Sequence, residues 1–103
     1  MDTQAVLAAF DEIAVARNWR PLHSPRNLAS AVALEAAELL QLFQWRAETG
    51  PVDAALRERI GEESADVLMY LLALCDRAGV DIEAAVARKI AANRRRFLPT
   101  SAP

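Results

Sequence analysis

The sequence contains little of what sheets and disulfide-stabilised domains require. Its 103 residues include three glycines, one cysteine and 6% aromatic residues. A sheet-rich fold with many tight turns is therefore not expected. A single cysteine cannot form an internal disulfide, which suits a reducing compartment. Cys75 ends the apolar run 67–75, and we interpret it as a small buried residue rather than a nucleophile.

The sequence also lacks a basic excess and the features that direct a chain into a membrane. Its formal net charge is −2, so no basic field attracts a nucleic-acid polymer. The first residues, MDTQAVLAAF, contain no basic segment of the kind found in signal peptides. The apolar run 67–75 has about half the length needed to span a bilayer. We therefore expect a soluble, cytoplasmic protein with neither a membrane nor a nucleic-acid partner.

Helix-forming residues are abundant instead. Hydrophobic residues make up 53% of the chain, and alanine and leucine, both strong helix formers, dominate them. Helical periodicity and end signals predict helices at roughly 2–18, 25–45, 53–78 and 81–97. The signals are Ser24 and Asp81 as N-caps, a break at 49–51, and Gly79 as a C-terminal stop. Gly61 is expected to mark a kink or a separate first turn. The predicted fold is a single all-α domain over residues 1–103, arranged as a four-helix antiparallel bundle.

The third predicted helix is apolar on every side between residues 67 and 74. A helix with this pattern has to be covered all round. One chain of this size cannot surround a central helix well. We therefore expect a homodimer or a dimer of dimers.

Acidic residues occupy the centre of two otherwise largely apolar helix faces. The face of the second helix consists of Leu28, Ala31, Glu35, Glu38, Leu42 and Trp45. The face of the third consists of Leu56, Arg59, Glu63, Asp66, Tyr70 and Ala73. Residues three apart project from the same side of a helix, so antiparallel packing of these faces brings four carboxylates together. Such a cluster requires a cation, and an all-oxygen ligand set favours Mg²⁺, or Mn²⁺ in its place.

The acidic residues admit two other interpretations. The carboxylates can instead pair with Arg59, Arg77, Lys89 or the arginines at 94–96, as acids on helices commonly do. Two separate pairs, each on an otherwise apolar face, favour the metal. A di-iron site requires Glu-x-x-His pairs, and the one histidine, His23, lies outside any such motif.

Basic and aromatic residues complement the acids. Lys89, Asn93 and Arg96 share one face of the fourth helix. Together with Arg94 and Arg95, they offer charge that neutralises a polyphosphate. The ordinary alternative is a basic last turn that complements the helix dipole. Side chains that stack on or hydrogen-bond to a base are Trp19, His23, Trp45 and Tyr70. Taken singly, Trp45 is also typical of core filling and His23 of a structural hydrogen bond.

These residues together resemble a known family. The pairs Glu35-Ala-Ala-Glu38 and Glu63-Ser-Ala-Asp66 resemble the ExxE…ExxD signature of MazG-like nucleotide pyrophosphohydrolases. The segments at 23–28, 42–45, 66–70 and 89–96, with Trp19, extend the likeness towards the dCTP pyrophosphatase branch. The resemblance implies Mg²⁺-dependent cleavage of a nucleoside triphosphate, dCTP or a modified dCTP, to the monophosphate and pyrophosphate. It also implies a four-helix fold that dimerises or tetramerises.

The resemblance implies a role for each matching position. Glu35, Glu38, Glu63 and Asp66 become the metal ligands and catalytic carboxylates. Trp19, His23 and Trp45 become the walls of a cytosine-type base pocket. Tyr70, Lys89, Asn93 and Arg96 become contacts to sugar or phosphate, partly across a subunit interface. Two alternatives remain open: a related pyrophosphohydrolase for another nucleotide, and a non-catalytic helical module whose acids and arginines fix an oligomer interface.

Overall fold

Each long helix of the protein begins at a side chain that caps its first turn. The computed structural model describes residues 1–99. Its long helices are α1 (Thr3–Ala16), α2 (Pro25–Gln41), α3 (Ala54–Ala78) and α4 (Ile82–Phe97), with a short 3₁₀ helix, η1, at Arg20–Leu22. Asp2, Ser24, Asp53 and Asp81 each accept a backbone N–H bond from the residue three positions later, at 2.8–3.1 Å. Residues 1–99 contain no strand, which confirms the all-α, four-helix prediction.

Helix α2 ends earlier than the sequence predicted. It stops at Gln41 instead of continuing to Trp45. The backbone N–H groups of residues 42–44 bond to carbonyls three positions back, at 3.0–3.3 Å, so the last turn tightens and the α-helix is not propagated. Arg46 Nε donates to the carbonyl of Leu42 at 3.0 Å. Trp45 itself has a φ of 67°, which lies outside the right-handed helix.

Helix α3 runs through Gly61 without interruption, so the expected separate first turn is absent. Its end agrees with the sequence prediction. Gly79 has a φ of 71°, and its N–H bonds back to the carbonyl of Asp76 at 3.2 Å. This left-handed conformation suits glycine because it carries no Cβ. It stops α3 and turns the chain towards α4.

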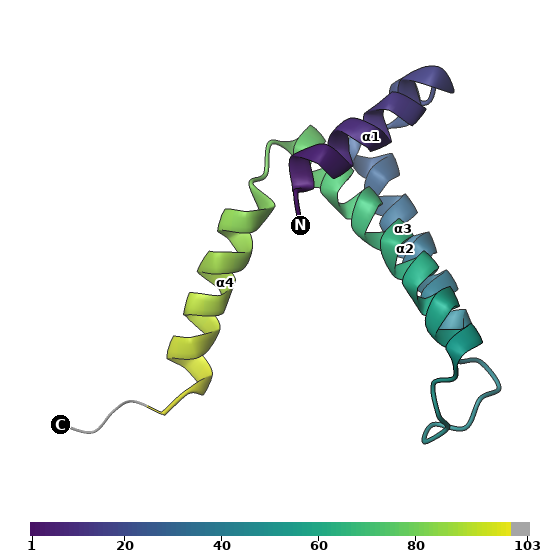
Figure 1. The fold of residues 1–103 in the computed structure, drawn as a ribbon. Helices are drawn as coiled ribbons and strands as arrows, with labels where there is room; N and C mark the ends of the chain where they lie inside the picture. The colour runs from purple at the N-terminus through teal and green to yellow at the C-terminus, as the bar shows by residue number, and fades with distance from the viewer. Residues whose placement is uncertain (100–103) are drawn as a thin grey trace.

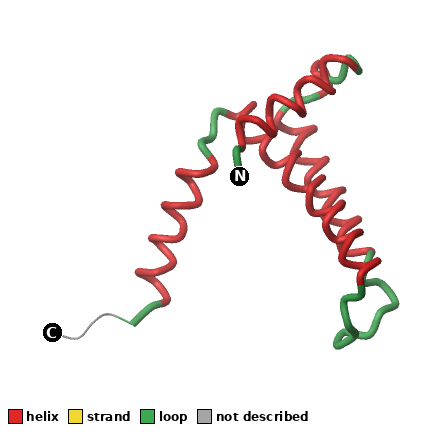
Figure 2. The backbone as a smooth tube through the Cα atoms, in the orientation of Figure 1, coloured by secondary structure: helices red, strands yellow, loops and turns green. Residues whose placement is uncertain are grey.

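Helices α2 and α3 form a long antiparallel hairpin, which is the most extensive helix contact in the described chain (Figure 1). Helix α1 packs across the end of this hairpin, against α3. Helix α4 extends away from the hairpin after the short turn at 79–81 (Figure 2). The radius of gyration is 17.5 Å, whereas a compact chain of this length has about 13 Å. Within one chain, therefore, the four helices do not close into a bundle.

The buried core is correspondingly small. Within residues 1–99 it comprises Ala14, Leu28, Leu42, Leu56, Leu72, Ala73 and Cys75. The burial of Cys75 agrees with its interpretation as a small apolar residue. Large apolar side chains remain on the surface, among them Leu34 at 67% and Leu40 at 72% exposed. None of the helices in the described part is long and apolar enough to cross a membrane.

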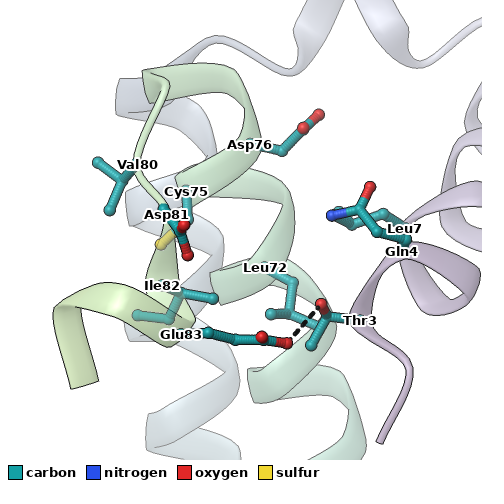
Figure 3. A pocket seen from close by; sticks show the side chains of 10 residues that line it. All are labelled: Thr3, Gln4, Leu7, Leu72, Cys75, Asp76, Val80, Asp81, Ile82 and Glu83. Carbon is teal, nitrogen blue, oxygen red and sulfur yellow. Dashed lines mark hydrogen bonds between the residues drawn. The ribbon is translucent and has the colours of Figure 1, made fainter. Parts of the chain in front are cut away.

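Helix α4 departs from a junction that it shares with α1 and α3. A cavity of about 320 Å³ lies there (Figure 3). The hydroxyl of Thr3 on α1 donates to Glu83 Oε1 on α4 at 3.2 Å, and both residues line the cavity. None of the side chains predicted to form the functional site lines this cavity. The junction therefore positions α4 rather than contributing to that site.

The cap of α3 gives a direct test of the fold. Asp53 Oδ1 accepts the N–H of Leu56 at 2.8 Å, and the Leu56 side chain is buried. We expect Asp53→Ala to lower the free energy of unfolding by about 0.5–2 kcal/mol, because an N–H at the start of α3 loses its partner. Asp53→Asn keeps an acceptor oxygen, so its free energy of unfolding should fall much less. Equal losses in the two variants, measured by urea denaturation, would contradict this role for the cap.

Candidate functional site

Three acidic side chains from the α2–α3 hairpin converge on one point. Glu35 on α2 and Glu63 and Asp66 on α3 each offer a carboxylate oxygen, and these oxygens lie within 4.8 Å of one another. Each of the three side chains is half-buried. The convergence follows from antiparallel pairing, since Leu28 on α2 and Leu42, just after its last residue, are buried on either side of Glu35. We call these three residues the acidic cluster.

The acidic cluster has no cationic partner in the described structure. Oε2 of Glu35 and Oε2 of Glu63 are buried without a hydrogen-bond donor. Within residues 1–99, the one ion pair joins Arg20 and Asp11 on the surface, at 3.1 Å. Buried carboxylate oxygens normally have partners. The interpretation that arginines neutralise these acids therefore finds no support here, whereas a hard divalent cation fits the orphaned oxygens and the all-oxygen donor set.

The electrostatics of the cluster agree with its geometry. Burial raises the pKa of Glu35, and the neighbouring Glu38 raises it further, followed by the charges of Asp66 and Glu63. Burial is also the leading cause that raises the pKa of Glu63, with Glu38 and Asp66 next. Both shifts mean that the folded protein disfavours the ionised carboxylates unless a positive charge joins them.

Glu38 lies beside the acidic cluster without being one of the three converging residues. Its side chain is exposed, unlike theirs. Its influence on the pKa values of both Glu35 and Glu63 shows that it borders the two. Of the two glutamates on α2, Glu35 is therefore half-buried and Glu38 is exposed to solvent.

An aromatic cavity of about 370 Å³ adjoins the acidic cluster through Asp66. It lies between α1, the turn after it, and α3. Its walls are Val6, Ala9, Phe10, Ile13, Trp19, Asp66, Met69 and Tyr70. Trp19 and Tyr70, both predicted to bind substrate, therefore share one cavity with a predicted metal ligand. The pKa of Tyr70 is raised by burial and then by the charges of Glu35 and Asp66, which keeps the phenol protonated beside the carboxylates.

His23 lies behind this cavity rather than in it. Its ring centroid is 5.4 Å from that of Phe10, with the planes tilted by 31°. Phe10 in turn meets Tyr70 edge to face, at 5.6 Å and 80°. His23 lines a second cavity of about 270 Å³ on the far side of Phe10. Its carbonyl accepts a bond from Arg77 Nε at 3.0 Å, which ties the turn to α3.

The structure does not bring the remaining predicted residues to the acidic cluster. Trp45 is 94% exposed, in the loop beyond α2. Lys89, Asn93 and Arg96 are exposed on α4, which extends away from the hairpin (Figure 1). The local spacing of these side chains was recognisable in the sequence, but their distance from the acids depends on how α4 and the loop are placed.

Sequence reasoning missed most of the wall that α1 contributes. Val6, Phe10 and Ile13 lie in the first predicted helix and were not among the predicted site residues, yet all three line the aromatic cavity. The same spacing also describes an ordinary core helix. A possible signal was the position of Trp19 just after this helix, since the turn folds it back towards the face that carries Phe10.

The chain is similar to known proteins over most of its length. The model of the MazG-like family matches residues 31–99. The chain is 47% identical to dCTP pyrophosphatase 1 of Homo sapiens and 43% identical to that of Mus musculus, each over 84% of the chain and 53% of the relative. It thus spans about half the length of the curated relatives it matches. A pyrophosphatase from Archaeoglobus fulgidus, known from a crystal structure, superposes with a TM-score of 0.82 at 37% identity, covering 96% of this chain and 94% of the other.

The raised pKa of Glu35 predicts how stability depends on pH without metal. Below the ordinary pKa of 4.5 the carboxyl is protonated in both states and has no net effect. As pH rises towards the higher folded pKa, the unfolded chain ionises first, so the folded state loses stability. In EDTA at about pH 7.5, we therefore expect Glu35→Gln to have a higher Tm than the wild type. This difference in Tm should shrink as the pH is lowered and vanish below about pH 4.5.

The matched control is Glu58→Gln, a change of the same type at an exposed position on α3. It should leave Tm nearly unchanged at both pH values. Added Mg²⁺ should raise the Tm of the wild type and have little effect on Glu35→Gln. A Glu35→Gln variant that is less stable than wild type at neutral pH in EDTA would show that the acids are not mutually repulsive.

Proposed function

The chain belongs to the MazG-like family, and from that premise we propose that it is a Mg²⁺-dependent nucleoside triphosphate pyrophosphohydrolase. The substrate we propose is dCTP or a modified dCTP, which is cleaved to the monophosphate and pyrophosphate. The observation that carries the proposal is the pair of buried, unpartnered oxygens on Glu35 and Glu63, with Asp66 converging beside them. In a purely structural polar network, the large majority of buried side-chain oxygens have a donor.

Each part of the site has a distinct task in this proposal. Glu35, Glu63 and Asp66 hold the metal, because their oxygens converge. When bound, Mg²⁺ supplies positive charge that offsets the charge of the triphosphate as the bond breaks. The base enters the aromatic cavity beside Trp19, and the Tyr70 hydroxyl faces the sugar. This arrangement explains why the cavity borders the acidic cluster through Asp66.

Glu38 is proposed as the proton acceptor. It borders the cluster but is exposed, so its carboxylate is accessible to water. As the water oxygen bonds to phosphorus, Glu38 takes the proton, and the P–O bond between the α- and β-phosphates breaks. The products are the nucleoside monophosphate and pyrophosphate.

Substitutions separate metal binding from proton transfer. We expect Asp66→Asn to lose both turnover and the rise in Tm caused by Mg²⁺, because a ligand is removed. Glu38→Gln should lower kcat by at least about 100-fold yet keep the rise in Tm. Pyrophosphate release from a panel of nucleoside triphosphates is the assay, with Glu58→Gln as the unaffected control.

The panel also separates the alternatives. Faster pyrophosphate release from another nucleotide would identify a related pyrophosphohydrolase. If Mg²⁺ no longer raises the Tm of Glu38→Gln, Glu38 is a fourth metal ligand. Full turnover in Asp66→Asn would contradict the proposed metal centre. A wild-type protein that neither releases pyrophosphate nor responds to Mg²⁺ would favour a non-catalytic oligomerisation module.

The phosphate-binding cations are proposed to come from a second copy of the chain. Lys89, Asn93 and Arg96 are exposed on a helix that stands away from its own acidic cluster. Val86 and Ile90 on the same helix are 48% and 47% exposed and lie one turn apart, so they offer apolar surface for a second subunit to cover. In a homodimer or homotetramer, α4 of one subunit covers the hairpin of another and brings its cations to the triphosphate. Trp45 is proposed to reach the substrate in the same way.

Subunit complementation tests this arrangement. Glu38→Gln and Lys89→Ala, each inactive alone, are mixed under conditions where light scattering shows oligomers and labelled subunits show exchange. In a two-fold dimer with shared sites, random mixing should restore about a quarter of wild-type activity. Glu38→Gln mixed with Asp66→Asn is the matched control and should restore none, because both residues belong to one hairpin. No recovery in the first mixture would show that each site takes its cations from its own chain.

A further inference from the structure

Phe10 stands between two cavities that differ in character. On one side lies the aromatic cavity of about 370 Å³, which contains Trp19 and Asp66. On the other lies the cavity of about 270 Å³, which contains His23 and Arg77. Among the residues that line these two spaces, Phe10 is the one they share. The Phe10 ring therefore forms the wall that separates the two cavities.

Two aromatic neighbours hold the Phe10 ring in place. The Tyr70 ring meets it edge to face, with centroids 5.6 Å apart, and the His23 ring lies against it at 5.4 Å. These neighbours belong to α3 and to the turn after η1, so two elements fix one ring from different directions. Such contacts restrict the rotation of a half-buried side chain. The position of the wall is thus set by the fold.

We propose that Phe10 is a specificity-determining residue that limits the size of the base the aromatic cavity accepts. The inference rests on the proposed function, because it assumes that the cavity receives a nucleotide base. A base in the aromatic cavity can extend no further than the Phe10 ring in that direction, so a two-ring purine meets the ring before a single-ring pyrimidine does. Removing the ring opens the aromatic cavity into the cavity behind it. Phe10 itself contacts no phosphate or metal ligand in this scheme.

Substitution of Phe10 is expected to change the selectivity between purine and pyrimidine triphosphates rather than to lower activity towards both. For Phe10→Ala, the ratio of kcat/KM for purine to that for pyrimidine triphosphates should rise by about tenfold, since differences of one or a few carbon groups in a pocket have effects of this size. The change should appear mainly in KM. Phe10→Leu keeps an apolar side chain at the wall, so the variant should remain folded. Its purine-to-pyrimidine ratio of kcat/KM should rise less than that of Phe10→Ala.

Leu7→Ala is the matched control. Leu7 also lies on α1 and lines the rear cavity, but it does not line the aromatic one. Its truncation enlarges the rear space without breaching the wall, so the selectivity ratio should stay at the wild-type value. The rise in Tm caused by Mg²⁺ should persist in all three variants, because none removes a carboxylate of the cluster.

The outcomes separate this inference from the proposed function. If the wild type hydrolyses nucleoside triphosphates but the ratio stays constant in Phe10→Ala and Phe10→Leu, Phe10 only packs the helices and the inference is wrong. If the wild type hydrolyses none, the proposed function fails. Calorimetric binding of cytidine and adenosine monophosphates then decides the inference without turnover. Purine binding that strengthens relative to pyrimidine binding in Phe10→Ala supports it, and unchanged relative binding overturns it.

Discussion

The packing of α2 against α3 is the contact on which the rest of the molecule depends. Leu28 from α2 and Leu42 just after it, with Leu56 and Ala73 from α3, are buried towards the two ends of the hairpin. Burial of each leucine contributes about 1.5–3 kcal/mol. Between these apolar ends lie carboxylates that repel one another and lose solvation. The leucines therefore hold together a group of charges that would separate if the helices were free.

The proposed function reconciles an anionic site with a polyphosphate substrate. The hairpin provides carboxylate oxygens but no ion-paired cation beside them within residues 1–99. In that proposal, a divalent ion supplies the missing charge and presents it to the phosphates. Five of the twelve basic residues lie on α4, whose last turn contains Arg94, Arg95 and Arg96. Within one chain α4 extends away from the hairpin, so these five residues do not neutralise the acidic cluster.

Helix α1 and the turn after it complete a different part of the site. They contribute Phe10 and Trp19 to the aromatic cavity, and the cavity meets the acidic cluster at Asp66. The bond from Arg77 to the carbonyl of His23 attaches this turn to α3. The aromatic cavity and two residues of the acidic cluster, Glu63 and Asp66, thus share α3 as a common support. A shift of α1 along α3 would change the cavity while leaving the carboxylates in place.

The sequence by itself determined the features that depend on neighbouring residues. Ser24, Asp53 and Asp81 cap their helices, and Gly79 ends α3, because caps and stops act within one turn. The spacing of Glu35 with Glu38, and of Glu63 with Asp66, placed each pair on one helix face for the same reason. The end of α2 was missed, because a tightened last turn competes closely with another helical turn. Only the tertiary structure decided that Glu38 lies outside the acidic cluster and that Phe10 and Trp19 line the same cavity. It also decided that Trp45 and Lys89 lie away from the acidic cluster. Those outcomes depend on how whole helices are placed against one another, and helical periodicity defines a face without specifying which distant face it meets.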